Sequence, residues 1–200
     1  MLFLAQSKYE MLMATRVADI EMPRTIAAST ALSEEFLEIA NDEKSKWQAY
    51  YYASLVTVQK GIELFRANEL DKLDEVADAA QIMLDKANNL SANNAEIYIL
   101  QKIILNLRIM VNPVERYLEF GEESEQNLNK ARKIDPENPR ITLLEAQEIY
   151  FMPQEYGGSK EEGLKLFEKA INQINTYPKK SEFYPSWGKV DAEYFLNNKP

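Results

Sequence analysis

One short pattern recurs four times along the chain and constrains the fold more than any other feature. A small residue is followed four positions later by Leu or Phe, and three positions after that by Ala. The four copies are Ser33/Leu37/Ala40, Ala80/Leu84/Ala87, Ser124/Leu128/Ala131 and Gly163/Phe167/Ala170. Spacings of three and four residues place all three members on one face of a helix. Because one such unit cannot bury that face alone, the pattern predicts helices that stack on their neighbours.

A direct comparison of the chain with itself supports repeats. When the sequence is shifted by 44 residues, the segment 86–100 aligns with 130–144, and Lys, Ala, Asn, Ile and Leu coincide at several positions. The final Ala residues of the four copies are separated by 47, 44 and 39 residues. The repeats are therefore long and irregular.

The rest of the chain also reads as helical. Apolar residues recur at spacings of three and four almost throughout, whereas the strict alternation typical of strands is scarce. Pro, Gly and Asn clusters mark the breaks between the helical segments. The chain is therefore predicted to be all-α, with helices near residues 7–21, 23–41, 43–66, 70–89, 94–110, 115–134, 139–151, 159–175 and 187–197.

Composition excludes several classes of function. The chain contains no His and no Cys, so catalytic triads with His, Cys nucleophiles, disulfides, and metal or haem sites that need His or Cys ligands are excluded. The net charge of -9 disfavours binding to nucleic acid or to anionic membranes. No apolar run approaches the roughly 20 residues that a membrane-spanning helix needs. A length of 200 residues with 46% hydrophobic residues fits one soluble domain.

Several local motifs suggest chemistry but have a simpler explanation. Ser186 and Lys189 have the Ser-x-x-Lys spacing of some acyl-transfer enzymes, yet no companion motif exists, and Trp187 between them is expected to pack on the preceding helix pair. Gly157-Gly158 lacks the other residues of a phosphate-binding loop. The acidic groups at 71–78 and 122–125 lack the spacing of a calcium loop and suit solvated helix ends. We therefore predict no catalytic, cofactor or metal site, and no enzyme.

The repeated second helix, followed by Asp135-Pro136-Glu137-Asn138-Pro139 and a new helix, resembles the tetratricopeptide repeat, whose usual period is about 34 residues. A wider resemblance is to the small exported tetratricopeptide-like proteins of Bacteroidota. It covers nearly the whole chain and is weakest from Met11 to Leu32. The matching segments are Ala5-Gln6-Ser7-x-Tyr9, Trp47-x-x-Tyr50-Tyr51-x-Ala53, 94–100, Asn112-Pro113, 135–140, Pro153-x-x-Tyr156-Gly157-Gly158 and Pro185-x-Trp187-Gly188.

This resemblance implies a fold and a compartment. The expected fold is a tetratricopeptide-like solenoid of four helix pairs with a C-terminal capping helix, formed by residues 7–200 as a single domain. The start of the chain, Met1 to Ser7, has the apolar run and small residue that end an export signal, although an ordinary helix start would look similar. The resemblance favours the first interpretation. Residues 1–6 are therefore predicted to be the remnant of a signal, and the protein to be periplasmic or extracellular.

The function that this architecture suggests is recognition. In such stacks the first helix of each pair lines a concave groove, and we predict a scaffold that binds a protein partner or an extended peptide there. The alternative is a small-molecule-binding accessory subunit of a transport or envelope system, with an enclosed apolar pocket. A hydrolase that uses only carboxylates or Ser and Lys has little support. The candidate groove residues are Lys44, Gln48, Tyr52, Ile99, Ile103, Arg140, Leu143 and Gln147.

Overall fold

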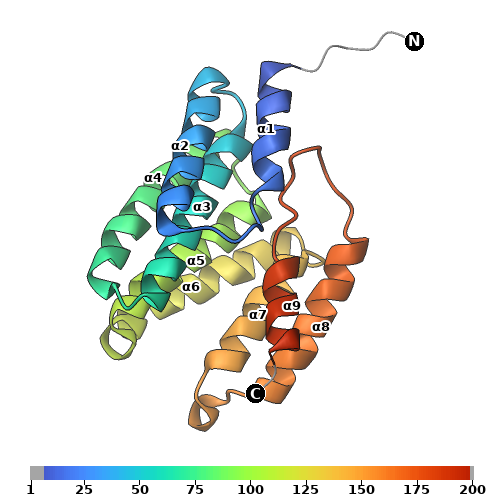
Figure 1. The fold of residues 1–200 in the computed structure, drawn as a ribbon. Helices are drawn as coiled ribbons and strands as arrows, with labels where there is room; N and C mark the ends of the chain where they lie inside the picture. The colour runs from blue at the N-terminus through green and yellow to red at the C-terminus, as the bar shows by residue number, and fades with distance from the viewer. Residues whose placement is uncertain (1–6, 199–200) are drawn as a thin grey trace.

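A computed structural model describes residues 7–198 of the chain, and that part contains helices and no strands. Figure 1 shows the helices running up and down in sequence, with α3 near the centre and α8 and α9 at one side. The helices are α1 (Lys8–Ala18), α2 (Ile26–Asp42), α3 (Trp47–Arg66), α4 (Leu73–Leu90), α5 (Ala95–Val111), α6 (Pro113–Ile134), α7 (Pro139–Phe151), α8 (Lys160–Thr176) and α9 (Lys189–Asn197). Two short 3-10 turns, η1 (Leu70–Lys72) and η2 (Gln154–Tyr156), precede α4 and α8.

The prediction of an all-α fold is confirmed for the described residues, and each of the nine predicted segments overlaps one α-helix. The ends differ by a few residues where a capping residue sets the boundary. Helix α1 begins after Ser7, which forms a capping box with Glu10, and α2 begins after Thr25, whose side chain accepts a hydrogen bond from the Ala28 amide. The predicted start at Pro23 was therefore two to three residues early.

The repeated pattern marks the faces along which the helices pack. Its four Ala residues, at positions 40, 87, 131 and 170, are completely buried. At the small positions the neighbouring helix comes very close: a Cβ atom at Gly163 would lie 2.7 Å from the Cβ of Tyr150 on α7. Ser33 Oγ donates to the Ala53 carbonyl of α3 at 3.0 Å. The small residues thus permit close approach, as the pattern predicts.

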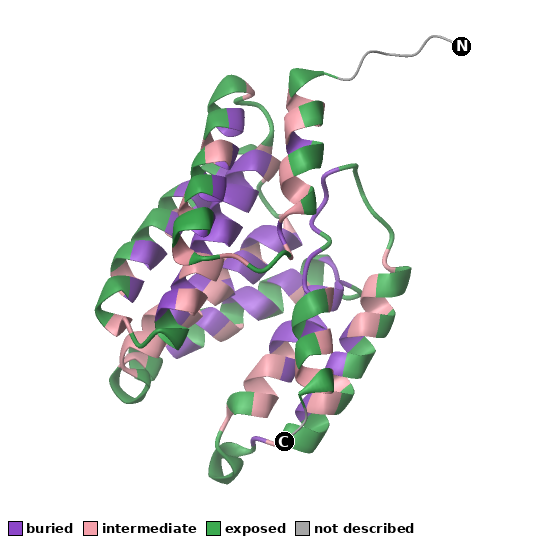
Figure 2. Cartoon of the chain, viewed as in Figure 1, coloured by how far each residue is buried: buried purple, intermediate pink, exposed green. Residues whose placement is uncertain are grey.

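The helices form two groups. Helices α1 to α6 pack successively against one another, and α7, α8 and α9 do the same, whereas α6 and α7 touch little beyond the turn that joins them. Figure 2 shows the buried residues on the sides of the helices that face their neighbours, with exposed residues on the outer sides. One continuous apolar core runs through both groups. How the groups meet decides the shape of the site.

Two further predictions concern a signal remnant at the start of the chain and the lack of a membrane-spanning helix. The predicted signal remnant, residues 1–6, lies outside the described residues. Among residues 7–198, no helix is both long enough and apolar enough to cross a bilayer.

Candidate ligand-binding cleft

A buried ion pair joins the two helix groups. Glu96 on α5 and Arg140 on α7 are 0% and 1% exposed. The guanidinium of Arg140 donates from Nε to Glu96 Oε2 at 2.8 Å and from a terminal nitrogen to Oε1 at 2.5 Å. Asn138 donates to the same carboxylate at 2.5 Å. Burial disfavours the charged guanidinium, but Glu96 outweighs that cost and raises the pKa of Arg140.

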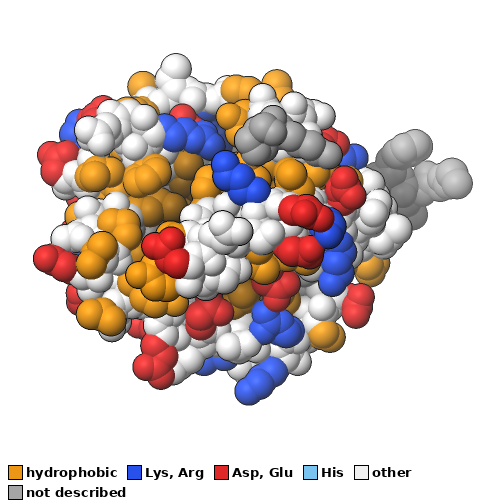
Figure 3. Space-filling model, turned by 90° about the horizontal axis from the view of Figure 1, so that it is seen from below, with side chains coloured by type: hydrophobic (Ala, Val, Ile, Leu, Met, Phe, Trp, Pro, Cys, Tyr) orange, Lys and Arg blue, Asp and Glu red, His pale blue; other side chains and the backbone are white. Residues whose placement is uncertain are grey.

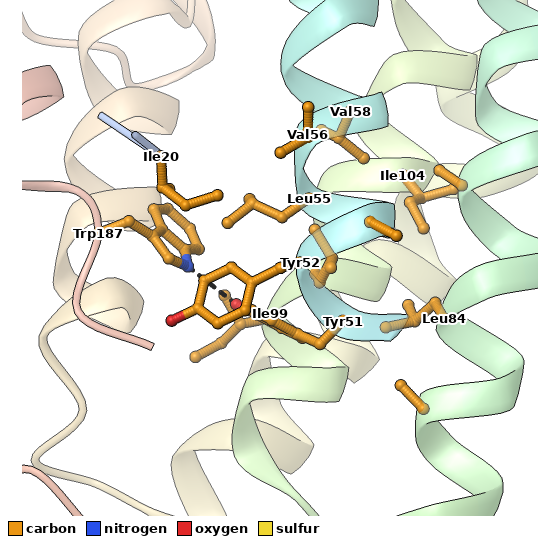
Figure 4. Close-up of a cluster of buried hydrophobic side chains, with 14 of the residues drawn as sticks. Ile20, Tyr51, Tyr52, Leu55, Val56, Val58, Leu84, Ile99, Ile104 and Trp187 are labelled. Carbon is orange, nitrogen blue, oxygen red and sulfur yellow. Dashed lines mark hydrogen bonds between the residues drawn. The ribbon is translucent and has the colours of Figure 1, made fainter. Parts of the chain in front are cut away.

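The pair extends into a network that also holds α3 and the C-terminal segment. Tyr51 on α3 donates its hydroxyl hydrogen to Glu96 at 3.3 Å and accepts one from Trp187 Nε1 at 2.9 Å. Figure 4 shows Trp187 directed toward Tyr51, beside the buried residues of α3. Trp187 is only 6% exposed, and its ring lies 5.8 Å from the guanidinium carbon of Arg140. We call Tyr51, Glu96, Arg140 and Trp187 the hub.

Trp187 therefore packs further into the molecule than expected. It was predicted to contact the preceding helix pair, and it does lie over Arg140 of α7, but its hydrogen bond reaches α3, 136 residues earlier in the chain. The segment between α8 and α9 makes a second such contact, because Tyr52 donates to the Phe183 carbonyl at 3.4 Å. The C-terminal segment thus holds the two helix groups together.

Figure 1 shows the two groups diverging toward the lower side of the molecule, and we call the region between them the cleft. On α5, Ile103 and Met110 follow Glu96 at intervals of seven residues and share its face; on α7, Gln147 and Phe151 share the face of Arg140. Further along these two faces, Ile103, Met110 and Gln147 are half-buried, and Phe151 is 66% exposed. Figure 3 shows a hollow on this lower side of the molecule, with hydrophobic side chains gathered in it.

Exposed apolar side chains also lie on α9 and at the start of α6. Tyr194 on α9 is 58% exposed, and its ring packs edge-on against Phe195, which in turn contacts Phe151. Val114 and Leu118 in the first turns of α6 are 85% and 88% exposed. Exposed apolar groups that gather around a hollow are typical of a binding surface.

A buried lysine fixes the spacing of the three helices behind the cleft. The ammonium group of Lys102 on α5 contacts Glu125 on α6 and lies 3.2 Å from Glu148 on α7. Lys102 is 2% exposed, so its charge is compensated entirely by these neighbours. This side chain belongs to the framework of the site.

A separate pocket lies at the other side of the hub, by the N-terminal ends of α3 and α5. Its volume is about 380 Å³ and its lining is both polar and apolar. The lining residues are Trp47, Gln48, Ser91, Ala92, Asn93, Asn94, Ala95, Ile134, Lys180, Ser181 and Tyr184. Across residues 7–198, no group of three or more Asp or Glu residues is arranged to hold a metal ion.

The structure separates the predicted groove residues into two sets. Ile103 and Gln147 are half-buried on the faces that continue from the hub, and Gln48 lines the separate pocket. Lys44 is exposed in the turn between α2 and α3, away from both. Two of the eight residues therefore lie along the cleft.

The other four predicted groove residues are at most 1% exposed and cannot line an open surface: Tyr52, Ile99, Arg140 and Leu143. Tyr52 stacks on Phe36 with ring centroids 5.4 Å apart. Arg140 is predicted to line the groove, but its ion pair with Glu96 holds it in the core. Leu143 is covered at Gly188, where an added Cβ would come within 2.6 Å of it. The prediction that first helices line an open groove did not include the C-terminal segment, which covers this side of the stack.

Sequence reasoning missed Met110, Phe151 and Tyr194. A signal for the first two existed, because Met110 lies seven residues after Ile103 and Phe151 lies four residues after Gln147, so each shares a helical face with a predicted residue. No comparable signal existed for Tyr194, since its position depends on how α9 returns to α7.

Comparisons with known proteins give one informative result. No protein-family model matches the chain, and no curated protein matches it. Among solved structures, the chain is similar to the HusA haemophore from Porphyromonas gingivalis, with a TM-score of 0.79 and 29% sequence identity. The match covers 96% of this chain and 92% of the haemophore.

This similarity corrects the predicted function. The prediction of a scaffold for a protein or peptide partner is contradicted, because the similar structure is that of a haemophore. The finding favours the alternative prediction, a protein that binds a small molecule. The error arose because a stack of helix pairs was assumed to use its concave side for peptides, whereas fold alone does not determine the ligand.

Proposed function

We propose that this protein binds a flat, largely apolar small molecule of the porphyrin class, such as haem, in the cleft between α3, α5, α7 and α9. The observation that carries the proposal is the similarity to a haemophore along 96% of the chain. In this proposal the protein is a carrier and not an enzyme.

The character of the cleft supports a ligand of this kind. Small-molecule sites are concave and mainly apolar, with few polar groups. Ile103 and Met110 offer an apolar wall on α5, and Phe151 and Tyr194 offer aromatic rings on the opposite side. Aromatic side chains bind flat rings through stacked or edge-on contacts. Burial of the ring contributes about 25 cal/mol for each Å² of apolar surface removed from water.

The composition determines how such a ligand would be held. The chain has no His and no Cys, which are common protein ligands of haem iron. Tyr and Met can also bind haem iron, but in this proposal binding rests on burial of the porphyrin ring and not on a bond to the iron. A metal-free porphyrin should then bind about as tightly as haem.

Direct titration tests the proposal. Haemin and metal-free protoporphyrin are added separately to the protein, and binding is followed by quenching of the fluorescence of Trp47 and Trp187 and by the shift of the porphyrin absorption band. We expect saturable binding of both with similar affinity. Failure of both porphyrins to bind would overturn the proposal.

A pair of variants places the site. Phe151→Glu introduces a charge at the cleft and should weaken binding of both porphyrins about tenfold or more, since the charge loses hydration when the ring covers it. Ile82→Glu makes the same kind of change at a similarly exposed apolar residue, 60% exposed on α4, and should leave affinity unchanged. Equal affinities for the two variants would place the ligand elsewhere.

We further infer that α1 to α8 form four tetratricopeptide-like hairpins with α9 as the cap, and that the protein is exported. The buried faces of the repeated pattern on α2, α4, α6 and α8 support the first inference. The similarity to a haemophore from a Bacteroidota species supports the second. Mass spectrometry of the protein secreted by its natural host tests export, with a mature chain that begins near Ser7 as the expected result.

A further inference from the structure

Arg24 differs from every other arginine in the described chain. The other six each have a carboxylate oxygen within 4.0 Å, and Arg24 has none. Its guanidinium donates instead to three neutral oxygens: the carbonyls of Asp19 and Ile20 and the side chain of Gln59. Its Nε is buried and has no hydrogen-bond partner. A chain with net charge -9 thus holds a half-buried cation that no acid neutralises.

Such a group is costly unless an anion joins it. Burial lowers the pKa of Arg24, and the more distant charges of Asp19 and Glu63 compensate only in part. A desolvated guanidinium gains most from a carboxylate, with which it can form two parallel hydrogen bonds. Arg24 therefore has the properties of an anion-binding residue.

The position of Arg24 relates it to the cleft. It lies in the linker between α1 and α2, and this linker joins α3 to α9. Ile20 lies beside Trp187 and Leu55 (Figure 4), and Glu21 accepts hydrogen bonds from the amides of Gly188 and Val190, at 2.8 and 3.1 Å, where α9 begins. Arg24 thus lies in a linker that contacts α3 and the start of α9, two of the helices between which the ligand is proposed to bind.

A second arginine lies at the end of α3, the helix that Arg24 contacts. Arg66 is seven residues after Gln59 on α3, so it shares the face that Arg24 contacts and lies about 10 Å along the helix axis. Its side chain is 60% exposed and pairs with Glu63 of its own helix at 2.5 Å. An exposed pair of this kind holds its arginine weakly, so Arg66 is free to meet a ligand.

Arg24 and Arg66 thus lie along one face of α3, one at its middle and one at its end. We call them the arginine edge.

We propose that the arginine edge binds the carboxylate groups of the ligand while its apolar ring occupies the cleft below. This inference rests on the proposed function and deepens it, because it assigns the class of ligand: flat apolar rings that carry free carboxylates on one side. A porphyrin with two propionate groups has this form. Esterified or uncharged rings lack the anions that Arg24 and Arg66 would neutralise, so the protein should discriminate against them.

The test compares protoporphyrin with its dimethyl ester, which has the same ring and no negative charge. We expect the wild-type protein to bind the free acid at least tenfold more tightly than the ester. Arg66→Gln and Arg24→Lys should each weaken binding of the acid about three- to tenfold and leave binding of the ester unchanged. Arg24→Lys retains the charge and loses the two-pronged geometry, whereas Arg66→Gln changes an exposed residue and leaves the core intact.

Arg16→Gln is the matched control, since Arg16 is also partly exposed, at 33% of its side chain, but pairs with Glu35 on α2. It should alter neither affinity. Equal wild-type affinities for acid and ester would overturn the arginine edge and leave porphyrin binding intact, whereas failure of both ligands to bind would overturn the proposed function itself. If the arginine variants lost affinity for the acid and for the ester equally, these residues would have a structural role, and the inference would be overturned.

Discussion

The hub and the cleft lie on the same two helix faces yet have opposite character. At the hub, Glu96 and Arg140 bring α5 and α7 together and are almost completely buried. About two to four turns further along the same faces, Ile103, Met110 and Phe151 remain partly exposed. The two helices are joined at the hub by a buried ion pair, and further along, beside the Lys102–Glu148 contact, the same faces carry partly exposed side chains.

This contrast predicts a division of roles. Changes at the hub should alter stability and the width of the cleft together, because the hub joins helices from both groups. Changes at the cleft should alter binding alone, because its side chains make few contacts that the folded state needs. The following variants test that division.

The largest expected effect is at the ion pair. Glu96→Ala leaves the guanidinium of Arg140 buried without a partner and should lower the free energy of unfolding by about 3 to 5 kcal/mol. Urea denaturation followed by circular dichroism measures the change. The double variant Glu96→Leu/Arg140→Leu removes both charges and should recover much of the lost stability. A double variant no more stable than Glu96→Ala would show that the cost lies in packing and not in the unpaired charge.

Trp187→Phe should have a smaller effect. It removes the hydrogen bond to Tyr51 and part of a buried ring, which together stabilise the fold by about 1 to 3 kcal/mol. Thermal unfolding of the variant gives the loss. Because Trp187 closes the hub from the C-terminal side, porphyrin affinity should also fall. Unchanged affinity in a destabilised variant would argue that the hub does not control the cleft.

The positions of the helices could be predicted from the sequence, whereas most residues of the site could not. Helix positions follow from local spacing and from caps such as Ser7 and Thr25, and the four buried Ala residues were visible as a repeat. The burial of Arg140 was not visible, since its partner Glu96 lies 44 residues earlier and nothing local marks either as internal. Tyr52 and Leu143 were misplaced because the segment before α9, which covers them, has no repeat pattern that would indicate its path.

The dependence of stability on pH tests the contribution of Asp135, which lies on the outer side of the hub. Asp135 accepts hydrogen bonds from Tyr177 and, at 2.5 Å, from Lys180. Burial alone would raise the pKa of Asp135, but these hydrogen bonds outweigh it and hold the pKa below the ordinary 3.8. A carboxyl with a lowered pKa in the folded state stabilises the fold above its unfolded pKa and loses that contribution as pH falls through the folded value.

Stability should therefore decline as the pH falls below about 4, and Asp135→Asn should reduce the slope of that decline. Denaturant midpoints between pH 2 and pH 6 measure it for both proteins. The exposed pair Lys8–Asp42, 2.7 Å apart, provides the comparison, and Asp42→Asn should have little effect. Identical slopes for Asp135→Asn and the wild-type protein would mean that other carboxylates dominate the acid response.

The variant Phe151→Ala should have the smallest effect on stability and a larger effect on porphyrin binding. Phe151 is 66% exposed, so Phe151→Ala should change the free energy of unfolding by no more than about 0.5 kcal/mol. The same variant removes one of the aromatic rings of the cleft and should weaken porphyrin binding severalfold. Measuring both quantities on one preparation sets this variant against Glu96→Ala. If Phe151→Ala instead costs as much stability as a hub variant, the side chain belongs to the core between α7 and α9, and the division between hub and cleft does not hold there.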